Sequence, residues 1–404
     1  MNPSETAVNG QKSGFIGNLS SSGYLAEMLF LISLVSIFFP TKIYPAVFLV
    51  SCFFFYRDTA EIRFPKWAIA LAIYSAYACT SYVFYSGEIS AGAINIFKLL
   101  INFSFLFFTV NWLAGRDNKL LIRKLDTVLL VVLALSLLQI VVYHQAYDFQ
   151  LLAGSTSSGQ ASSLYRDSLY YWGLDDKNMF GARIALLGFA YICIPITKNQ
   201  LSVWRIVFVF LIAFLSLSRT PLVALFIGVF FLIWISVSRK WKILAFVLVV
   251  LSLPLALQKF IRIDSLTSSN DGMGIRITYW KAFFLHFGEI SPLGNGFGST
   301  PEFLRNYADY YRGEPHIHST FLSNYLELGI FGFFSFLAFL SFYIQACLQK
   351  GENVKFWTAL FLPLLSIMMI LYSGYDNDVV MYLCLIFLIG SVGKVNFHTL
   401  KFTL

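Results

Sequence analysis

The fold is decided by runs such as residues 126–143, which have the sequence DTVLLVVLALSLLQIVVY. After Asp126 this run carries no charged side chain, and as a helix it is long enough to cross the ~30 Å hydrocarbon core of a bilayer. The same pattern recurs about twelve times along the chain, near 24–39, 43–56, 67–85, 93–113, 126–143, 180–196, 203–217, 221–237, 242–257, 319–346, 356–373 and 378–392. We therefore predict an all-α polytopic integral membrane protein with a single transmembrane domain over residues 24–404.

The composition agrees with a membrane protein. Hydrophobic residues make up 58% of the 404 residues and charged residues only 12%, against a usual charged fraction of about 25%. These values exclude a cytosolic enzyme, a nucleic-acid binder and a disordered scaffold, and the net charge of +8 has its source in cytoplasmic loops. The five cysteines show no CxxC spacing, so neither a disulfide framework nor a zinc site is predicted.

The distribution of positive charge predicts the orientation. Residues 1–23 are polar and rich in Ser, Gly and Asn, which predicts a disordered cytoplasmic tail. With the N-terminus inside, most of the 29 lysines and arginines fall on the cytoplasmic side, whereas the outer connections 86–92 and 374–377 have none. Because cytoplasmic loops are enriched in Lys and Arg, we expect both termini to be cytoplasmic.

Two outer segments, about 144–179 and 258–318, are much longer than the other connections. Loops of this length are usually functional or disordered, and the second contains too many aromatic residues for a disordered segment. Within it, residues 277–287 are predicted to form an amphipathic helix at the outer interface. We expect function to be concentrated in this loop.

Three arginines at the predicted outer surface are candidate anion ligands. Arg219 lies between two apolar runs joined by almost no loop, Arg276 opens the aromatic segment, and Arg183 lies one turn into the sixth run. Arginine suits bidentate phosphate recognition, so the three could form a cationic cup for a lipid diphosphate. The alternative is three unrelated interface anchors.

His318 is the candidate general base, because an unperturbed histidine titrates near pH 6.5. Ser319 and Thr320 can cap the helix that follows, and His316 either orients the loop or is the base itself. If that helix already includes His318, Glu327 lies on its opposite face. We therefore expect Glu327 not to contact His318 and to make an internal hydrogen bond that holds the bundle together.

Carboxylates offer a different chemistry. Asp376 and Asp378 form a D-x-D pattern, which could hold a divalent cation for a metal-dependent glycosyl transfer. We interpret Asp376 or Asp378 instead as a charge partner of the arginines, with no metal. Lys98 and Glu27, which lie inside predicted spans, would suit a proton-coupled carrier.

The motif around His318 resembles the signature of bacterial O-antigen ligases, in a superfamily that also contains O-antigen polymerases. The signature is a His followed by Asn, Ser or Gln, nine residues, Gly, two residues, and Gly, Thr or Tyr. Here it is matched by His318-Ser319, nine residues, Gly329, two residues and Gly332. The segment PLGNGFG at 292–298 is also similar to a glycine-rich stretch of that family.

The resemblance implies a GT-C-type bundle that acts as a metal-independent, inverting glycosyltransferase without a cofactor. Such an enzyme moves O-polysaccharide from undecaprenyl diphosphate onto a sugar hydroxyl of lipid A–core, at the periplasmic face of the bacterial inner membrane. His318 would act on the acceptor hydroxyl as base or positioner. Arg219 and Arg276 would bind the departing diphosphate.

Two alternatives stay open. A polymerase would use the same donor with a lipid-linked acceptor, but polymerases are described by paired Arg-x10-Gly motifs that the outer arginines here do not make. A multi-span permease would need paired charges near the middle of the membrane.

Overall fold

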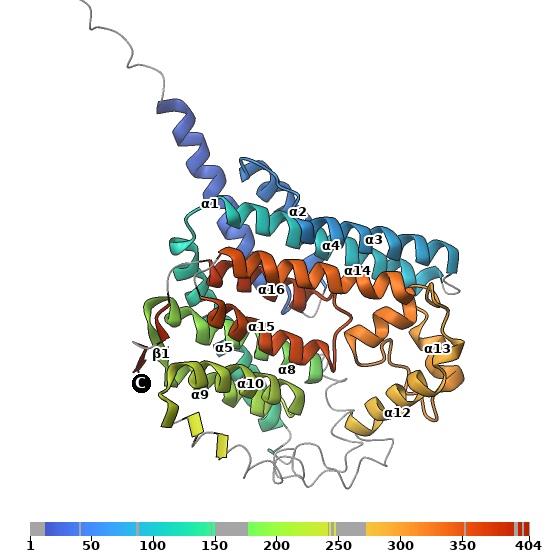
Figure 1. Ribbon diagram of the computed structural model, residues 1–404. Helices are drawn as coiled ribbons and strands as arrows, with labels where there is room; N and C mark the ends of the chain where they lie inside the picture. The colour runs from blue at the N-terminus through green and yellow to red at the C-terminus, as the bar shows by residue number, and fades with distance from the viewer. Residues whose placement is uncertain are drawn as a thin grey trace, which may run out of the picture.

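The computed structural model describes residues 13–39, 42–85, 89–146, 148–149, 177–240, 242–243, 246–247, 272–350, 353–391, 395–397 and 400–403. This part of the chain is built almost wholly from helices (Figure 1). They are α1 Ser13–Ser36, α2 Tyr44–Asp58, α3 Lys66–Tyr85, α4 Ile89–Ala114, α5 Lys119–Ala146, α8 Lys177–Cys193, η1 Ile194–Lys198, α9 Val203–Leu215, α10 Arg219–Ser236, α12 Gly272–Leu285, η4 Phe287–Glu289, α13 Thr300–Tyr307, α14 Thr320–Lys350, α15 Val354–Met368 and α16 Asn377–Gly390. Two short strands, β1 Gln200–Ser202 and β2 Lys401–Thr403, pair in parallel, with Leu201 opposite Phe402.

The helices follow the predicted apolar runs. A helix lies at every predicted span except 242–257, most of which is outside the described residues. Among the described helices, six are long and apolar enough to cross a membrane, and α9, α15 and α16 belong to a shorter apolar group. The all-α membrane class is therefore confirmed.

Two helices form the centre of the bundle. The candidate span Asn178–Lys198 includes most of α8, and 94% of its most apolar 18 residues are buried. The corresponding share in the other five long candidate spans is 33–44%. Every residue of α16 is also buried. Small residues allow this close packing: a Cβ added at Gly188 would lie 2.3 Å from Val209, and one added at Gly390 would lie 2.5 Å from Trp357.

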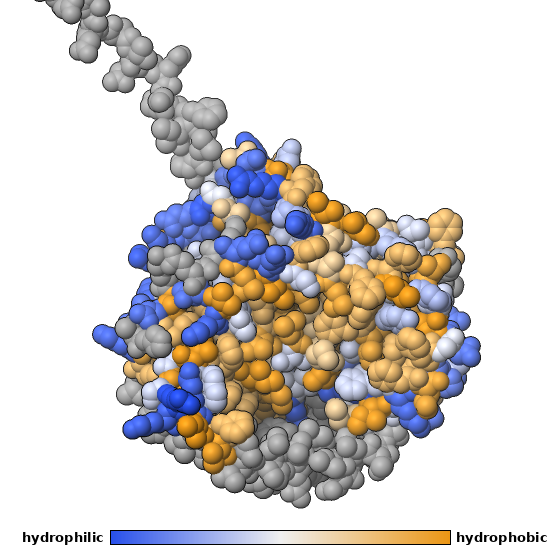
Figure 2. Space-filling view, viewed as in Figure 1, coloured by the Kyte–Doolittle hydropathy of each residue, from blue (hydrophilic) through white to orange (hydrophobic). Residues whose placement is uncertain are grey.

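The surrounding helices expose large apolar side chains. Phe84 is 75% exposed, Ile94 71% and Phe97 66%. Figure 2 shows this apolar surface as a broad area across the middle of the visible face, with hydrophilic residues toward its two ends. An apolar area of this extent is unfavourable in water, whereas hydrocarbon tails cover it at no cost. This arrangement suits a multi-pass membrane protein.

The two ends of the bundle differ. One end carries α12, α13 and the start of α14, and the opposite end carries β1 and the C-terminus (Figure 1). Glu27 of α1 pairs with Arg116, which follows the C-terminal end of α4, and with Lys124 of α5. A second ion pair joins Asp126 of α5 to Arg205 of α9. Glu27 is therefore part of a cluster at the end of the helices opposite to α12.

The N-terminal helix is longer than expected. α1 begins at Ser13, so residues 13–23 are helical and not part of a disordered tail, while residues 1–12 lie outside the described residues. No proline occurs between Ser13 and Gly23 that would prevent helical backbone there.

α14 is broken at Gly329, which has φ 62° and ψ −155°. The break frees carbonyl groups, and the segment PLGNGFG binds them: the amide of Asn295 donates to the carbonyl of Leu326, and the amide of Gly296 donates to that of Glu327. In return, the amide of Ile330 donates to the carbonyl of Pro292 at 2.9 Å. We call these three backbone hydrogen bonds the clasp.

Glu327 secures the same region. Its Oε1 accepts a hydrogen bond from the hydroxyl of Thr300 at 2.6 Å, in a buried position at the start of α13. The backbone of Gly298 and Thr300 also donates to this carboxylate. The expected internal hydrogen bond of Glu327 is therefore confirmed, and the clasp fixes the outer loop to α14.

Candidate functional site

His318 lies in the segment that enters α14 and has a strained backbone. Its φ is 59°, a left-handed value that is uncommon for residues other than glycine. α14 begins at Thr320, so the helix does not include His318 and the helical face considered above does not apply. The expected cap is present, because the amide of Leu322 donates to Ser319 Oγ at 3.4 Å.

α12 supports the histidine segment from one side. The imidazole of His318 lies parallel to the ring of Tyr279, with centroids 5.9 Å apart and an interplanar angle of 4°. Trp280 Nε1 donates to the carbonyl of Ile317 at 3.2 Å, and the Tyr279 hydroxyl donates to Glu314. α12 ends at Leu285 and so covers most of the helix predicted at 277–287, and its Tyr279 and Trp280 contact His318 and the residue before it.

Both histidines of this segment are held neutral. Burial lowers the pKa of His318 to about 3, with further lowering by the positive charges of Arg276, His316 and Arg312. Burial also lowers the pKa of His316 to about 4, against the opposing effect of the Asp376 carboxylate. At neutral pH each imidazole is therefore uncharged and can accept a hydrogen bond.

Arg276 reaches toward the N-terminus of α10. Its Nη1 donates to Thr220 Oγ1 at 3.2 Å, and Arg219 is the first residue of α10. Arg276 is only 8% exposed and lies close enough to His318 to affect its titration. A helix N-terminus and two arginines here bring together groups that attract anions. Ser218 occupies the N-cap position of α10.

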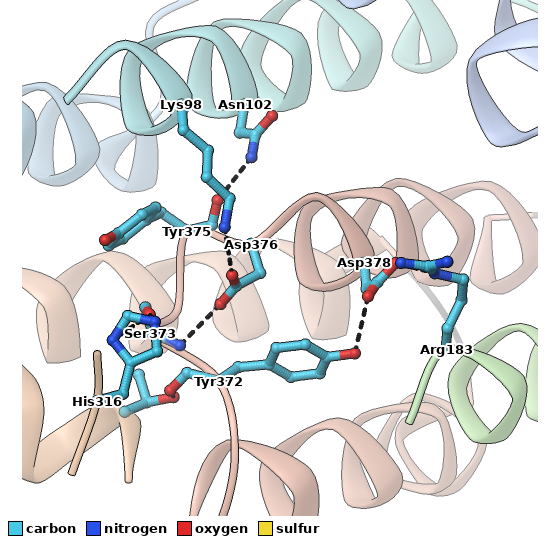
Figure 3. Close-up of polar contacts among 10 residues, drawn as sticks. Lys98, Asn102, Arg183, His316, Tyr372, Ser373, Tyr375, Asp376 and Asp378 are labelled. Carbon is cyan, nitrogen blue, oxygen red and sulfur yellow. Dashed lines mark hydrogen bonds and ion pairs between the residues drawn. The ribbon is translucent and has the colours of Figure 1, made fainter. Parts of the chain in front are cut away.

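Arg183 is part of a different buried group. Its Nε donates to Asp378 Oδ1 at 2.7 Å, and both side chains are less than 10% exposed. The Tyr372 hydroxyl donates to the other oxygen of Asp378 at 3.0 Å (Figure 3). The prediction that Asp378 is the charge partner of an arginine is confirmed, and this carboxylate is engaged on both oxygens.

Asp376 has a different kind of partner from Asp378. Lys98 Nζ donates to Asp376 Oδ1 at 2.7 Å, so the carboxylate pairs with a lysine of α4 and not with an arginine. The reason is geometric: in Figure 3 Lys98 points from α4 into the segment that joins α15 to α16, while Arg183 lies at Asp378. Ser373 and His316 complete this group and are described further below.

Sequence reasoning missed three residues that contact the site. Lys98 was assigned no partner, although a lone lysine in an apolar run was a usable signal. Tyr279 and Ser373 gave no signal beyond their residue types. Among the described residues, no group of three or more His, Cys, Asp or Glu side chains is placed to hold a metal ion.

The fold and this group of residues define a multi-pass membrane protein whose histidine and arginines gather at one end of a helical bundle. Residues 204–337, about a third of the chain, match the family model described as O-antigen ligase. The match confirms the resemblance that the motif at His318 indicated, and it supports assignment to the O-antigen ligase and polymerase family, which implies a glycosyl-transferring enzyme. No curated protein matches the chain.

Proposed function

We propose that this protein is an O-antigen ligase, which transfers O-polysaccharide from undecaprenyl diphosphate onto a sugar hydroxyl of lipid A–core. In this proposal it lies in the bacterial inner membrane, with both termini in the cytoplasm and the histidine site facing the periplasm. The observation that carries the proposal is the proximity of neutral His318 to Arg276, whose guanidinium contacts the first turn of α10.

The proposed reaction uses these groups as follows. The acceptor hydroxyl oxygen forms a bond to the anomeric carbon while the bond from that carbon to the diphosphate oxygen breaks, and the electron pair leaves with the diphosphate. The hydroxyl proton passes to the imidazole of His318. Arg276 and Arg219 stabilise the negative charge that develops on the leaving diphosphate, so this departure requires no metal ion. The single displacement inverts the configuration of the anomeric carbon.

Donor binding would also adjust the base. The positive charge of Arg276 contributes to the low pKa of His318. A diphosphate bound at Arg276 offsets that charge, and the pKa of His318 then rises toward the range in which it accepts a proton readily. The imidazole would be most basic when the donor is in place.

The proposal is tested by the lipopolysaccharide pattern of the source bacterium after deletion of this gene. A ligase predicts bare lipid A–core and accumulation of long polymer on the lipid carrier, restored by the wild-type gene. Core that carries a single repeat unit would identify a polymerase. An unchanged ladder would exclude both and leave the permease.

The dependence of the transfer rate on pH can be measured with the purified protein, and it tests the environment of His318. Because burial lowers the pKa of His318 to about 3, its neutral form persists as the pH falls from 7 to 5. We expect kcat/KM, which reports the free enzyme, to show no acidic limb from His318 until well below pH 5. An acidic limb near pH 6.5 that disappears in His318→Gln would show that His318 titrates as an ordinary histidine and would contradict the buried environment.

A further inference from the structure

The segment between α15 and α16 links Lys98 to the histidines through a continuous set of contacts. Lys98 Nζ donates to Asp376 Oδ1 at 2.7 Å, and Asp376 Oδ2 accepts from the backbone amide of Ser373 at 2.7 Å. The Ser373 hydroxyl lies 3.0 Å from Nε2 and 3.2 Å from Nδ1 of His316. We call Lys98, Asp376, Ser373 and His316 the relay (Figure 3).

The centre of the relay is buried, and both oxygens of its carboxylate accept a hydrogen bond. Asp376 is 2% exposed and Ser373 5%, and Lys98 is partly buried, with 26% of its side chain exposed. A second contact joins α4 to the segment between α15 and α16, because Asn102 Nδ2 donates to the carbonyl of Tyr375 at 2.7 Å. The position of Ser373 is therefore set from α4.

A contribution to stability does not by itself explain why a buried ion pair stands between Lys98 and Asp376. Removing two charges from water costs about as much as their attraction returns, and apolar residues of similar size are often as stable. What a buried ion pair provides more reliably is a fixed geometry. Here the fixed group is a serine hydroxyl beside His316.

His316 in turn restrains His318. The residue between them, Ile317, is fully buried, and its carbonyl is held by Trp280. His318 keeps a left-handed φ of 59°, and strained backbone of this kind persists only where its surroundings hold it. Tyr279 of α12 contacts the imidazole of His318 directly, and the relay contacts His316, two residues earlier in the same segment.

We infer that Lys98, Asp376 and Ser373 are positioning residues that fix His316 and thereby place the imidazole of His318 for transfer. The inference rests on the proposed ligase function. It assigns to Lys98, which lies in a predicted span, a role in the outer site and not in proton transport. None of the three residues is required to contact a substrate.

The test compares variants in a transfer assay with purified protein, lipid-linked polysaccharide and lipid A–core. Lys98→Met is expected to lower kcat about 10- to 100-fold, the cost of a small misplacement of a reacting group, and to leave the KM for the donor unchanged. Ser373→Ala keeps the ion pair and removes only the hydroxyl, so it is expected to lower kcat in the same way in a normally folded protein. Lys98→Arg, which keeps the charge, is expected to recover part of the loss.

A matched control is Lys281→Met. Lys281 on α12 also makes an ion pair, at 2.8 Å with Asp309, but both side chains are more than half exposed. The loss of an exposed pair is worth little, and kcat is expected to stay at the wild-type value. The control separates the loss of any lysine from the loss of the relay.

A double-mutant cycle gives the decisive readout. If Ser373 acts through His316, the variant Ser373→Ala/His316→Gln is expected to be no slower than His316→Gln alone. Additive losses, or a kcat of Ser373→Ala equal to that of wild type, would overturn the inference while the ligase assignment stood. A wild-type protein that formed no lipopolysaccharide would instead contradict the proposed function itself.

Discussion

His318→Ala is expected to lower the kcat for transfer by about 10²- to 10⁴-fold, the usual contribution of a general base. The structure gives the reason in two parts. The imidazole is held parallel to Tyr279 at 5.9 Å, so its direction is fixed, and burial keeps it in the neutral form that accepts a proton. Alanine removes the acceptor without disturbing the helices on either side.

The measurement is the initial rate of lipopolysaccharide formation with both substrates saturating. His286→Ala is the matched control, since His286 packs against Tyr307 with centroids 4.6 Å apart and has no place in the proposed reaction. It is expected to keep the wild-type rate. If His316→Ala lost far more activity than His318→Ala, the base would be His316 and the assignment of His318 would be wrong.

The helices could be predicted from the sequence because their signal is local. An apolar run such as 126–143 specifies a helix by its own composition, and α5 contains it. The helix predicted at 277–287 has the same kind of signal, and α12, which ends at Leu285, covers most of it. The internal bond of Glu327 was also predicted, although from a helical face that included His318, whereas α14 begins only at Thr320.

The polar partners could not be predicted in the same way. Lys98 and Asp376 are 278 residues apart in sequence, and nothing near either residue indicates the other. Asp376 and Asp378 look alike as a D-x-D pattern, yet one pairs with a lysine of α4 and the other with an arginine of α8. The choice depends on which helix each carboxylate faces, which is a property of the packed bundle.

Gly329 shows a third reason why part of the structure could not be predicted from the sequence. A glycine in an apolar run predicts close helix packing, but glycine accepts both signs of φ, so its residue type does not indicate a break. The break at Gly329 arises because PLGNGFG supplies partners for the freed carbonyls of Leu326 and Glu327. Two motifs that the resemblance identified separately are thus one structural unit.

Gly329→Ala is expected to lower the free energy of unfolding by roughly 2–5 kcal/mol, because two penalties add. A φ of 62° is unfavourable for alanine. The added Cβ would also lie 2.2 Å from the carbonyl oxygen of Pro292 and 2.4 Å from the amide nitrogen of Gly294. These are backbone atoms that cannot rotate away, so the PLGNGFG segment must move and the clasp must open.

Two glycines of the outer loop separate the penalties when thermal unfolding of the purified proteins is compared in one detergent. Gly313 has φ 88° with no atom within 4 Å of an added Cβ, so Gly313→Ala is expected to cost only the conformational part, about 1–2 kcal/mol. Gly288 also has open space around an added Cβ, without a left-handed φ, and Gly288→Ala is expected to leave the unfolding temperature unchanged. Equal unfolding temperatures for Gly329→Ala and Gly313→Ala would mean that the contact with PLGNGFG adds nothing. A larger loss at Gly329 would show that alanine is costlier there, where it meets the backbone of Pro292 and Gly294 at a ψ of −155°, than at Gly313.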